Sequence, residues 1–129
     1  MMKLNKVHHI AIIASDYARS LDFYTRILGL NVIAENFRAD RESYKTDLAL
    51  NGDYIIELFS FPNPPARVSR PEAAGLRHLA FEVDDIDAAV SELDAKGVEH
   101  EAIRVDEYTG KRFVFFQDPD HLPIEFYES

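Results

Sequence analysis

Two stretches of similar sequence decide the fold: His9–Ile10–Ala11–Ile12–Ile13–Ala14–Ser15–Asp16 and His78–Leu79–Ala80–Phe81–Glu82–Val83–Asp84–Asp85. They match at the histidine, the alanine and the final aspartate, with the histidines 69 residues apart. A second pair of similar apolar runs places Glu57 and Glu125 at 68 residues from each other. Each half of the chain therefore begins with a histidine on an apolar run and ends with a glutamate on one, which indicates an internal repeat.

An amphipathic helix is expected directly after the first stretch of each half. Asp16 precedes a run to Leu28 that has apolar residues at three- and four-residue spacing, and a glycine follows it. Asp85 and Gly97 enclose residues 86–96 in the same way. An aspartate before such a run and a glycine after it are typical helix start and stop signals.

Three short strands are expected after each helix. In the first half they span 31–35, 46–50 and 54–61, and in the second half 99–105, 112–117 and 123–127. Asn51–Gly52 and Asp118–Pro119–Asp120 are typical turns between the last two strands of each half. The pattern predicts an α+β fold of two βαβββ modules in a single domain, with module 1 at about 5–61, a proline-containing linker at about 62–75 and module 2 at about 76–128.

The composition excludes several classes of protein. Of the 129 residues 47% are apolar and 29% charged, which is typical of a globular domain. The chain has no cysteine, so thiolate metal sites, disulfides and thiol nucleophiles are excluded. A net charge of −9 argues against binding to nucleic acid or to an anionic membrane surface. No run approaches the length of a membrane span, and we expect a cytoplasmic protein.

Strand alternation places four ionisable side chains on equivalent faces of four strands. His9, Glu57, His78 and Glu125 each share a face that is opposite to a uniformly apolar one. Each could simply be solvated, as one face of an antiparallel sheet often is. Since a pseudo-twofold repeat brings equivalent positions together, the set instead favours a metal site. Imidazole and carboxylate groups suit one divalent ion, Ni²⁺, Zn²⁺, Co²⁺, Mn²⁺ or Fe²⁺.

The sequence resembles the vicinal oxygen chelate superfamily, which includes glyoxalase I and the bleomycin-resistance proteins. The resemblance covers nearly the whole chain. It implies two βαβββ modules that form a curved eight-stranded mixed sheet with a central metal cleft, and His9, Glu57, His78 and Glu125 match the four ligands of glyoxalase I. The matching stretches are His9 with Asp16, Ser20–Leu21–Asp22–Phe23–Tyr24, Leu28–Gly29, Ile56–Glu57–Leu58, His78–Leu79–Ala80–Phe81, Asp118–Pro119–Asp120 and Ile124–Glu125.

The resemblance also implies a reaction. The small-molecule substrate would offer two adjacent oxygens to the metal, and proton transfer next to a carbonyl would proceed through a metal-bound enediolate. Glu125 matches the catalytic glutamate that carries the proton, and Glu57 is the possible partner base. The expected activity is that of a lyase or isomerase similar to lactoylglutathione lyase, in a homodimer. Alternatives are an epimerase of an acyl thioester, an Fe-dependent dioxygenase and a small-molecule binding or resistance protein.

Two departures from glyoxalase I concern the substrate. Ile13 and Phe61 stand where the bacterial enzymes typically have an arginine and an asparagine that contact glutathione, and Glu82 is equivalent to Ile13 in the second half. We therefore do not expect lactoylglutathione to be the natural substrate. Phe59 and Phe61 are candidate pocket walls, and Arg112 is a candidate to bind a substrate carboxylate or phosphate. A weaker candidate for that role is the group Arg38, Arg41 and Lys45.

Overall fold

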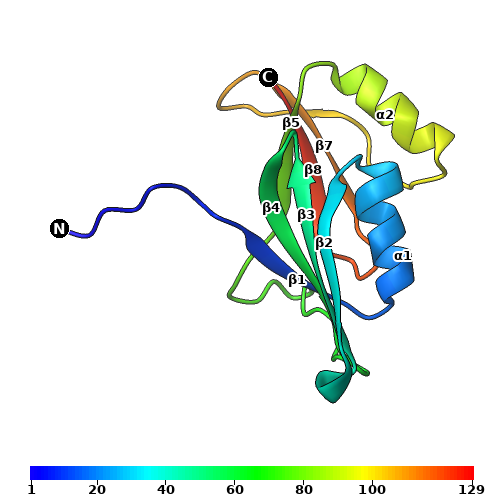
Figure 1. The fold of residues 1–129 in the computed structure, drawn as a ribbon. Coiled ribbons are helices and arrows are strands. Elements are labelled where there is room, and N and C mark those ends of the chain that lie inside the picture. Colours follow the sequence, from blue (N-terminus) through cyan, green and yellow to red (C-terminus); the bar gives the residue numbers. More distant parts are fainter. The chain divides into compact units, whose positions relative to one another are not determined.

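The two halves of the sequence fold as two units, Met1–Pro65 and Ala66–Ser129, and the computed structural model describes all residues from 1 to 129. Figure 1 shows the elements along the chain, which begins with an extended segment before the first strand. Residues 1–9 of this segment are exposed. No helix in either unit is long and apolar enough to cross a lipid bilayer.

The first unit contains one sheet with the strand order β1-β4-β3-β2. β1 runs parallel to β4, and the other neighbours are antiparallel. The turn between β3 and β4 has positive φ at both Asn51 and Gly52, as a tight two-residue hairpin requires. The elements are β1 (Ile10–Ala14), α1 (Tyr17–Asp22), η1 (Phe23–Ile27), β2 (Asn31–Arg38), η2 (Ala39–Arg41), β3 (Ser43–Leu50) and β4 (Asp53–Ser60).

The second unit repeats this topology with the order β5-β8-β7-β6, where β5 runs parallel to β8. The two βαβββ modules are therefore confirmed. Hydrogen bonds divide the eight strands into two four-stranded sheets, since every strand pairing joins strands of the same module. The elements are β5 (Leu79–Val83), α2 (Ile86–Ala95), β6 (Arg104–Val105), β7 (Arg112–Gln117) and β8 (Pro123–Glu128).

Both helices begin at the aspartates that the sequence indicates. The Asp16 side chain accepts from the Arg19 N–H, and that of Asp85 accepts from the Ala88 N–H. The first helix differs from expectation because its second part is π-helical: the Leu28 N–H donates to the Phe23 carbonyl at 3.0 Å. This wider turn contains two buried aromatic side chains, those of Phe23 and Tyr24.

One face of each sheet packs under the helix of its own unit. Helix α1 contacts β4 and helix α2 contacts β8. The apolar side chains on these faces are almost fully buried: Ile12, Ala14, Ile56 and Leu58 in the first unit, and Val114, Phe116 and Ile124 in the second. The other face of each sheet is left for the candidate ligands, as strand alternation predicts.

The region expected as a strand at 99–105 is mostly irregular. Only Arg104–Val105 pairs regularly with β7, and His100 makes an isolated bridge to Phe116. Between them the Glu101 carboxylate accepts the Phe115 N–H at 3.0 Å. The Glu101 side chain thus accepts a backbone N–H group that would otherwise donate to a neighbouring strand, which explains why the strand is interrupted.

Candidate metal centre

The first His–Glu pair lies on the sheet of the first unit. His9 is the residue before β1, and β4 carries Glu57 opposite Ala11 of β1. The His9 Nε2 and Glu57 Oε1 atoms are 3.6 Å apart. The Glu57 side chain is 15% exposed and that of His9 is 35% exposed, so the carboxylate is the more enclosed of the two groups.

Polar neighbours enclose this first pair. The Lys45 Nζ group donates to Asp47 Oδ1 at 3.3 Å and lies 3.1 Å from Glu57 Oε2. The Tyr54 ring stacks on His9 with centroids 5.0 Å apart, and its O–H donates to Asp47 Oδ1 at 3.0 Å. The hydrogen bond with Glu57 raises the pKa of Lys45, and burial, followed by the Asp47 contact, raises the pKa of Tyr54.

Two members of this group escaped the sequence analysis. Asp47 faces Glu57 directly in the register of β3 and β4, and this register cannot be read from the pattern of either strand alone. Simple alternation along β4 would place Tyr54 on the apolar face. However, the pairing register of β3 with β4 shifts between Leu48 and Ala49, and the Tyr54 ring lies against His9. The irregularity re-aims the side chain.

The second His–Glu pair has apolar surroundings. His78 precedes β5 and Glu125 lies on β8, with 3.2 Å between His78 Nε2 and Glu125 Oε1. The Phe115 ring packs edge-on against His78 with centroids 5.0 Å apart. The His78 Nδ1 atom is buried and has no hydrogen-bond partner. Glu125 is paired with His78 and with no lysine or arginine.

Each pair offers two donors that suit a divalent metal ion, and the structure brings no three histidine, aspartate or glutamate side chains together into one site. Two ligand atoms that each lie about 2.1 Å from one ion, at a right angle, are about 3 Å apart. The nitrogen–oxygen separations of 3.6 Å and 3.2 Å approach this value. Imidazole and carboxylate donors are the set that first-row divalent ions accept.

Three residues expected near the substrate lie on the same face as Glu57. Ile13 is opposite Phe59 in the pairing of β1 with β4, and its side chain is 52% exposed. The rings of Phe59 and Phe61 stack with centroids 5.8 Å apart. These three side chains therefore form an apolar surface beside the first His–Glu pair.

In the second unit the structure separates Glu82 from Arg112. Glu82 is exposed on β5, opposite Tyr127 and on the side of His78 by alternation. Arg112 faces α2 instead, where its Nη2 lies 3.1 Å from Asp87 and 3.3 Å from Glu128. The expected substrate role of Arg112 is not supported, because β7 alternation turns it to the helix side and two carboxylates already bind it.

His8 lies beside His9 at the edge of the first pair. It is exposed, and its Nδ1 lies 2.8 Å from the Nδ1 of His9. Its ring also contacts Tyr54 edge-on, with centroids 5.3 Å apart. The residue precedes β1, so strand alternation does not fix its direction.

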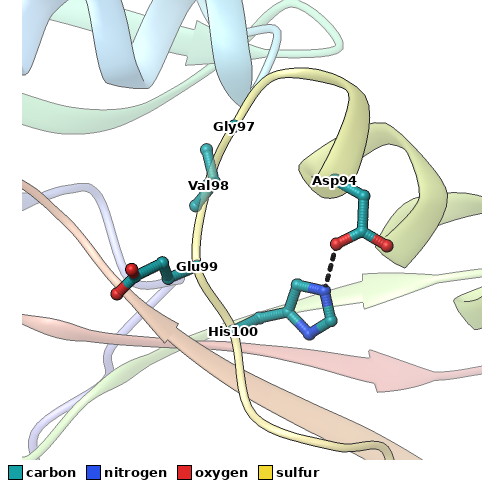
Figure 2. Close-up of a pocket in the computed structure, with 5 residues that line it drawn as sticks. All are labelled: Asp94, Gly97, Val98, Glu99 and His100. Carbon is teal, nitrogen blue, oxygen red and sulfur yellow. Dashed lines mark hydrogen bonds and ion pairs between the residues drawn. The ribbon is translucent and has the colours of Figure 1, made fainter.

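An open pocket on the second unit lies apart from the His78–Glu125 pair. Figure 2 shows its lining, residues 94 and 97–100, at the end of α2. The His100 Nε2 lies 2.6 Å from Asp94 Oδ1, and its Nδ1 lies 2.7 Å from the Glu101 carbonyl. The carbonyl contact, followed by the Asp94 contact, raises the pKa of His100. These contacts tie the end of the helix to the following segment.

Residues 6–126 match the Glyoxalase/Bleomycin resistance protein/Dioxygenase superfamily. The Escherichia coli (strain K12) protein YaeR is 65% identical over 129 residues, which cover 100% of both chains. The crystal structure of a glyoxalase family protein from Enterococcus faecalis is 45% identical, covers 98% of this chain and 100% of its own, and has a TM-score of 0.91. A 2-epi-5-epi-valiolone epimerase from Actinomyces sp is 29% identical over 92% of this chain and 76% of its own.

Proposed function

The chain belongs to the Glyoxalase/Bleomycin resistance protein/Dioxygenase superfamily, and from this premise we propose that it is a metal-dependent lyase or isomerase. Its reaction would move a proton between positions next to a carbonyl group. The observation that carries the proposal is a His–Glu pair on the sheet of each unit, with nitrogen–oxygen separations of 3.6 Å and 3.2 Å. A protein that only binds a small molecule has no need to keep both pairs.

His9, Glu57, His78 and Glu125 would hold one divalent ion. When bound, the ion acts as a Lewis acid that stabilises negative charge developing on a substrate oxygen. The two half-sites would come from one chain or from two copies of it. We propose a homodimer, because each sheet ends in strands with an unpaired edge, and exposed edges are usually covered.

The surroundings of the two glutamates support different roles for them. Glu57 has one oxygen near His9 and the other 3.1 Å from the Lys45 ammonium, which holds the carboxylate in place. Glu125 has no lysine or arginine in ion-pair contact, and Arg77 acts on it only through a longer-range Coulomb interaction, so less opposes its movement. Glu125 is therefore the better candidate to take up the proton from carbon and return it, with Glu57 as an anchored ligand and possible second base.

Exchange of a carbon-bound proton in deuterated water tests this proposal. The hemithioacetals of methylglyoxal with glutathione and with 2-mercaptoethanol would be incubated with the metal-loaded protein without oxygen. We expect exchange with the wild type, a loss of about 100-fold or more in Glu125→Gln, and little change in Glu92→Gln, an exposed carboxylate on α2. Given Ile13 and Phe61, the glutathione adduct should be the poorer substrate.

Three results would overturn parts of the proposal. Activity that requires Fe²⁺ and oxygen would assign a dioxygenase, and unchanged exchange in Glu125→Gln would remove the proton carrier. Turnover of the glutathione adduct as fast as in a dedicated glyoxalase would contradict the interpretation of Ile13 and Phe61.

Epimerisation is the second candidate, and the similarity to the Actinomyces epimerase favours it. It uses the same removal and return of a proton, but the proton returns to the opposite face of the same carbon. A single-enantiomer methylmalonyl thioester would become racemic with the wild type if this candidate is correct. Retention of configuration during exchange would exclude it for that substrate.

Light scattering at about 10 µM protein tests the homodimer, and a monomer would contradict it. A mixture of His9→Ala and His78→Ala chains then distinguishes the two arrangements of ligands. Restored metal binding in the mixture means that each site takes ligands from two chains. Binding that stays weak means that one chain supplies all four.

A further inference from the structure

Arg38, the last residue of β2, places a guanidinium group on the aromatic wall beside the first half-site. Its Cζ atom lies 5.1 Å from the centroid of the Phe59 ring and 5.8 Å from that of Phe61. Of its five N–H donors, the structure assigns one, on Nη2, to the Ser43 hydroxyl at 2.8 Å. The Nε atom is buried and has no hydrogen-bond partner.

The strand register places a second cation beside the same ring. Lys45 of β3 is directly opposite Phe59 of β4, and its ammonium reaches Glu57, two residues before Phe59 on the same face. The Arg38 guanidinium lies over this ring as well. Two positive groups and an aromatic surface are thus found next to a candidate metal ligand.

The second unit contains a comparable arginine that lies on aromatic rings but is paired with a carboxylate. Arg104 lies over Phe113 and Phe115, at 4.8 Å and 5.7 Å from their centroids. Its Nε and Nη2 atoms, however, are 3.0 Å and 2.9 Å from Glu101 Oε1. Arg38 has no carboxylate partner of this kind. A guanidinium that is partly desolvated without an anion is unfavourable, so the first unit lacks a counter-ion that the second unit carries itself.

We propose that Arg38 binds a carboxylate of the substrate, with Lys45 as a second positive charge. This inference rests on the proposed function, because it takes Glu57 as a metal ligand. The substrate would then carry two adjacent oxygens for the metal at one end and a carboxylate at the other, joined by carbon atoms that contact Phe59 and Phe61. A planar guanidinium suits a carboxylate, since two parallel N–H groups can donate to its two oxygens.

Two hydroxamates that differ only at the far end test this subsite. Succinic monohydroxamate and butyrohydroxamate chelate a metal in the same way, but the first ends in a carboxylate and the second in a methyl group. Calorimetry with the Ni²⁺-loaded protein should show that the carboxylate form binds at least about tenfold more tightly to the wild type. The proposal is overturned by equal affinities.

Variants of the two cations test which side chain is responsible for the preference for the carboxylate form. Arg38→Met should reduce the ratio of the two affinities to near one, and Lys45→Met should reduce it about threefold. Arg38→Lys keeps a charge and should retain part of the preference, which separates a lost contact from a misfolded sheet. Arg104→Met is the matched control and should leave the ratio unchanged. An unchanged ratio in Arg38→Met, or an equal loss in Arg104→Met, contradicts the assignment.

A measurement without metal separates this inference from the proposed function. Sodium succinate would be titrated into the metal-free protein while the Arg38 Nε–H signal is followed by ¹⁵N NMR. A saturable shift of this signal that is weakened or lost in Lys45→Met supports the carboxylate subsite. This result would hold even if neither hydroxamate binds and the proposed metal site is incorrect. Absence of any shift at saturating succinate contradicts the subsite, even if the metal binds as proposed.

Discussion

The two half-sites keep the same pair of side chains but surround them differently. In the register of the sheets, Asp47 faces Glu57 in the first unit, and Phe115 faces Glu125 at the equivalent place in the second. Lys45 likewise corresponds to Phe113, which faces Tyr127. The two halves therefore share the candidate ligands, but at two equivalent positions the first half has charged side chains where the second has aromatic rings.

This difference suggests a division of labour between two halves of similar topology. The charged half fixes its glutamate through a lysine and stacks a tyrosine on its histidine. In the second half a phenylalanine ring packs on the histidine, and the glutamate has no lysine or arginine in ion-pair contact, only the longer-range charge of Arg77. A symmetric pair of half-sites would give both glutamates the same freedom, whereas here only Glu57 is held by a lysine, which is the basis for the different roles that we propose.

The largest effect on stability should come from placing an aspartate in the second half at the position equivalent to Asp47. Phe115→Asp places a carboxylate beside Glu125 and His78, where the nearby cation Arg104 is already paired with Glu101. We therefore expect the free energy of unfolding to fall by about 2–4 kcal/mol. Phe115→Leu keeps an apolar side chain and should cost less than about 1.5 kcal/mol. Urea unfolding measures both. A loss in Phe115→Asp no greater than that in Phe115→Leu would show that the aromatic environment is not required.

A smaller effect is expected at the turns that join the last two strands of each unit. The second unit uses a buried side chain there, since Asp118 Oδ1 accepts the N–H groups of Asp120 at 2.8 Å and Leu122 at 2.9 Å. Asp118→Ala leaves both donors without this acceptor and should cost about 1–3 kcal/mol. Thermal unfolding measures the change against Asp40→Ala, an exposed control. Equal melting temperatures for the two variants would contradict this role of Asp118.

The charge of the first half should also oppose the metal. Lys45 lies 3.1 Å from Glu57, so its ammonium competes with a cation for that carboxylate. Lys45→Met should therefore increase Ni²⁺ affinity roughly three- to tenfold, corresponding to about 1 kcal/mol of Coulomb repulsion. Chelator competition measures this effect, with Lys111→Met on an exposed loop as control. Unchanged or weaker metal binding in Lys45→Met would contradict this prediction, because the hold of Lys45 on Glu57 would then outweigh the repulsion between the two cations.

The smallest effect concerns His100, which has Val32 as its counterpart in the first half: His100 bridges to Phe116 as Val32 pairs with Leu48. Acceptors at both ring nitrogens raise the pKa of His100, so the folded protein favours the charged ring. This stabilisation is complete below the unfolded pKa of about 6.5 and is lost as the pH rises through the raised pKa. His100→Gln should therefore lower the free energy of unfolding at about pH 5.5 by less than about 1 kcal/mol. The loss should be smaller near pH 9, and thermal unfolding at the two pH values measures it. A loss that grows with pH would contradict this sign.

The repeat explains why so much of the fold could be predicted. Asp16 and Asp85 cap their helices as expected, and the polar faces of the strands carry His9, Glu57 and their counterparts, because capping and alternation are local properties. Arg112 could not be placed, since its role depends on two carboxylates that approach from α2 and β8.

The charged neighbours of the first half were only partly accessible from sequence. Lys45 and Arg38 stood out as cations, but their position beside Phe59 depends on the pairing of β3 with β4 and on the path of β2. Asp47 and Tyr54 could not be identified from the sequence as neighbours of the first pair. The pairing register of β3 with β4 places Asp47 opposite Glu57, and the local irregularity in that pairing accompanies the position of Tyr54. Contacts across strands decide these positions, and a single sequence does not contain the register.

The central claim is that both halves contribute to one metal site, and metal affinity tests it most directly. Ni²⁺ and Zn²⁺ binding would be measured by chelator competition in the wild type and in His9→Ala, Glu57→Ala, His78→Ala and Glu125→Ala, with His121→Ala as control. We expect one ion for each set of four ligands, a loss of at least about 100-fold in every ligand variant, and no change in the control. Absence of binding in the wild type, or losses confined to the variants of one unit, would contradict the claim.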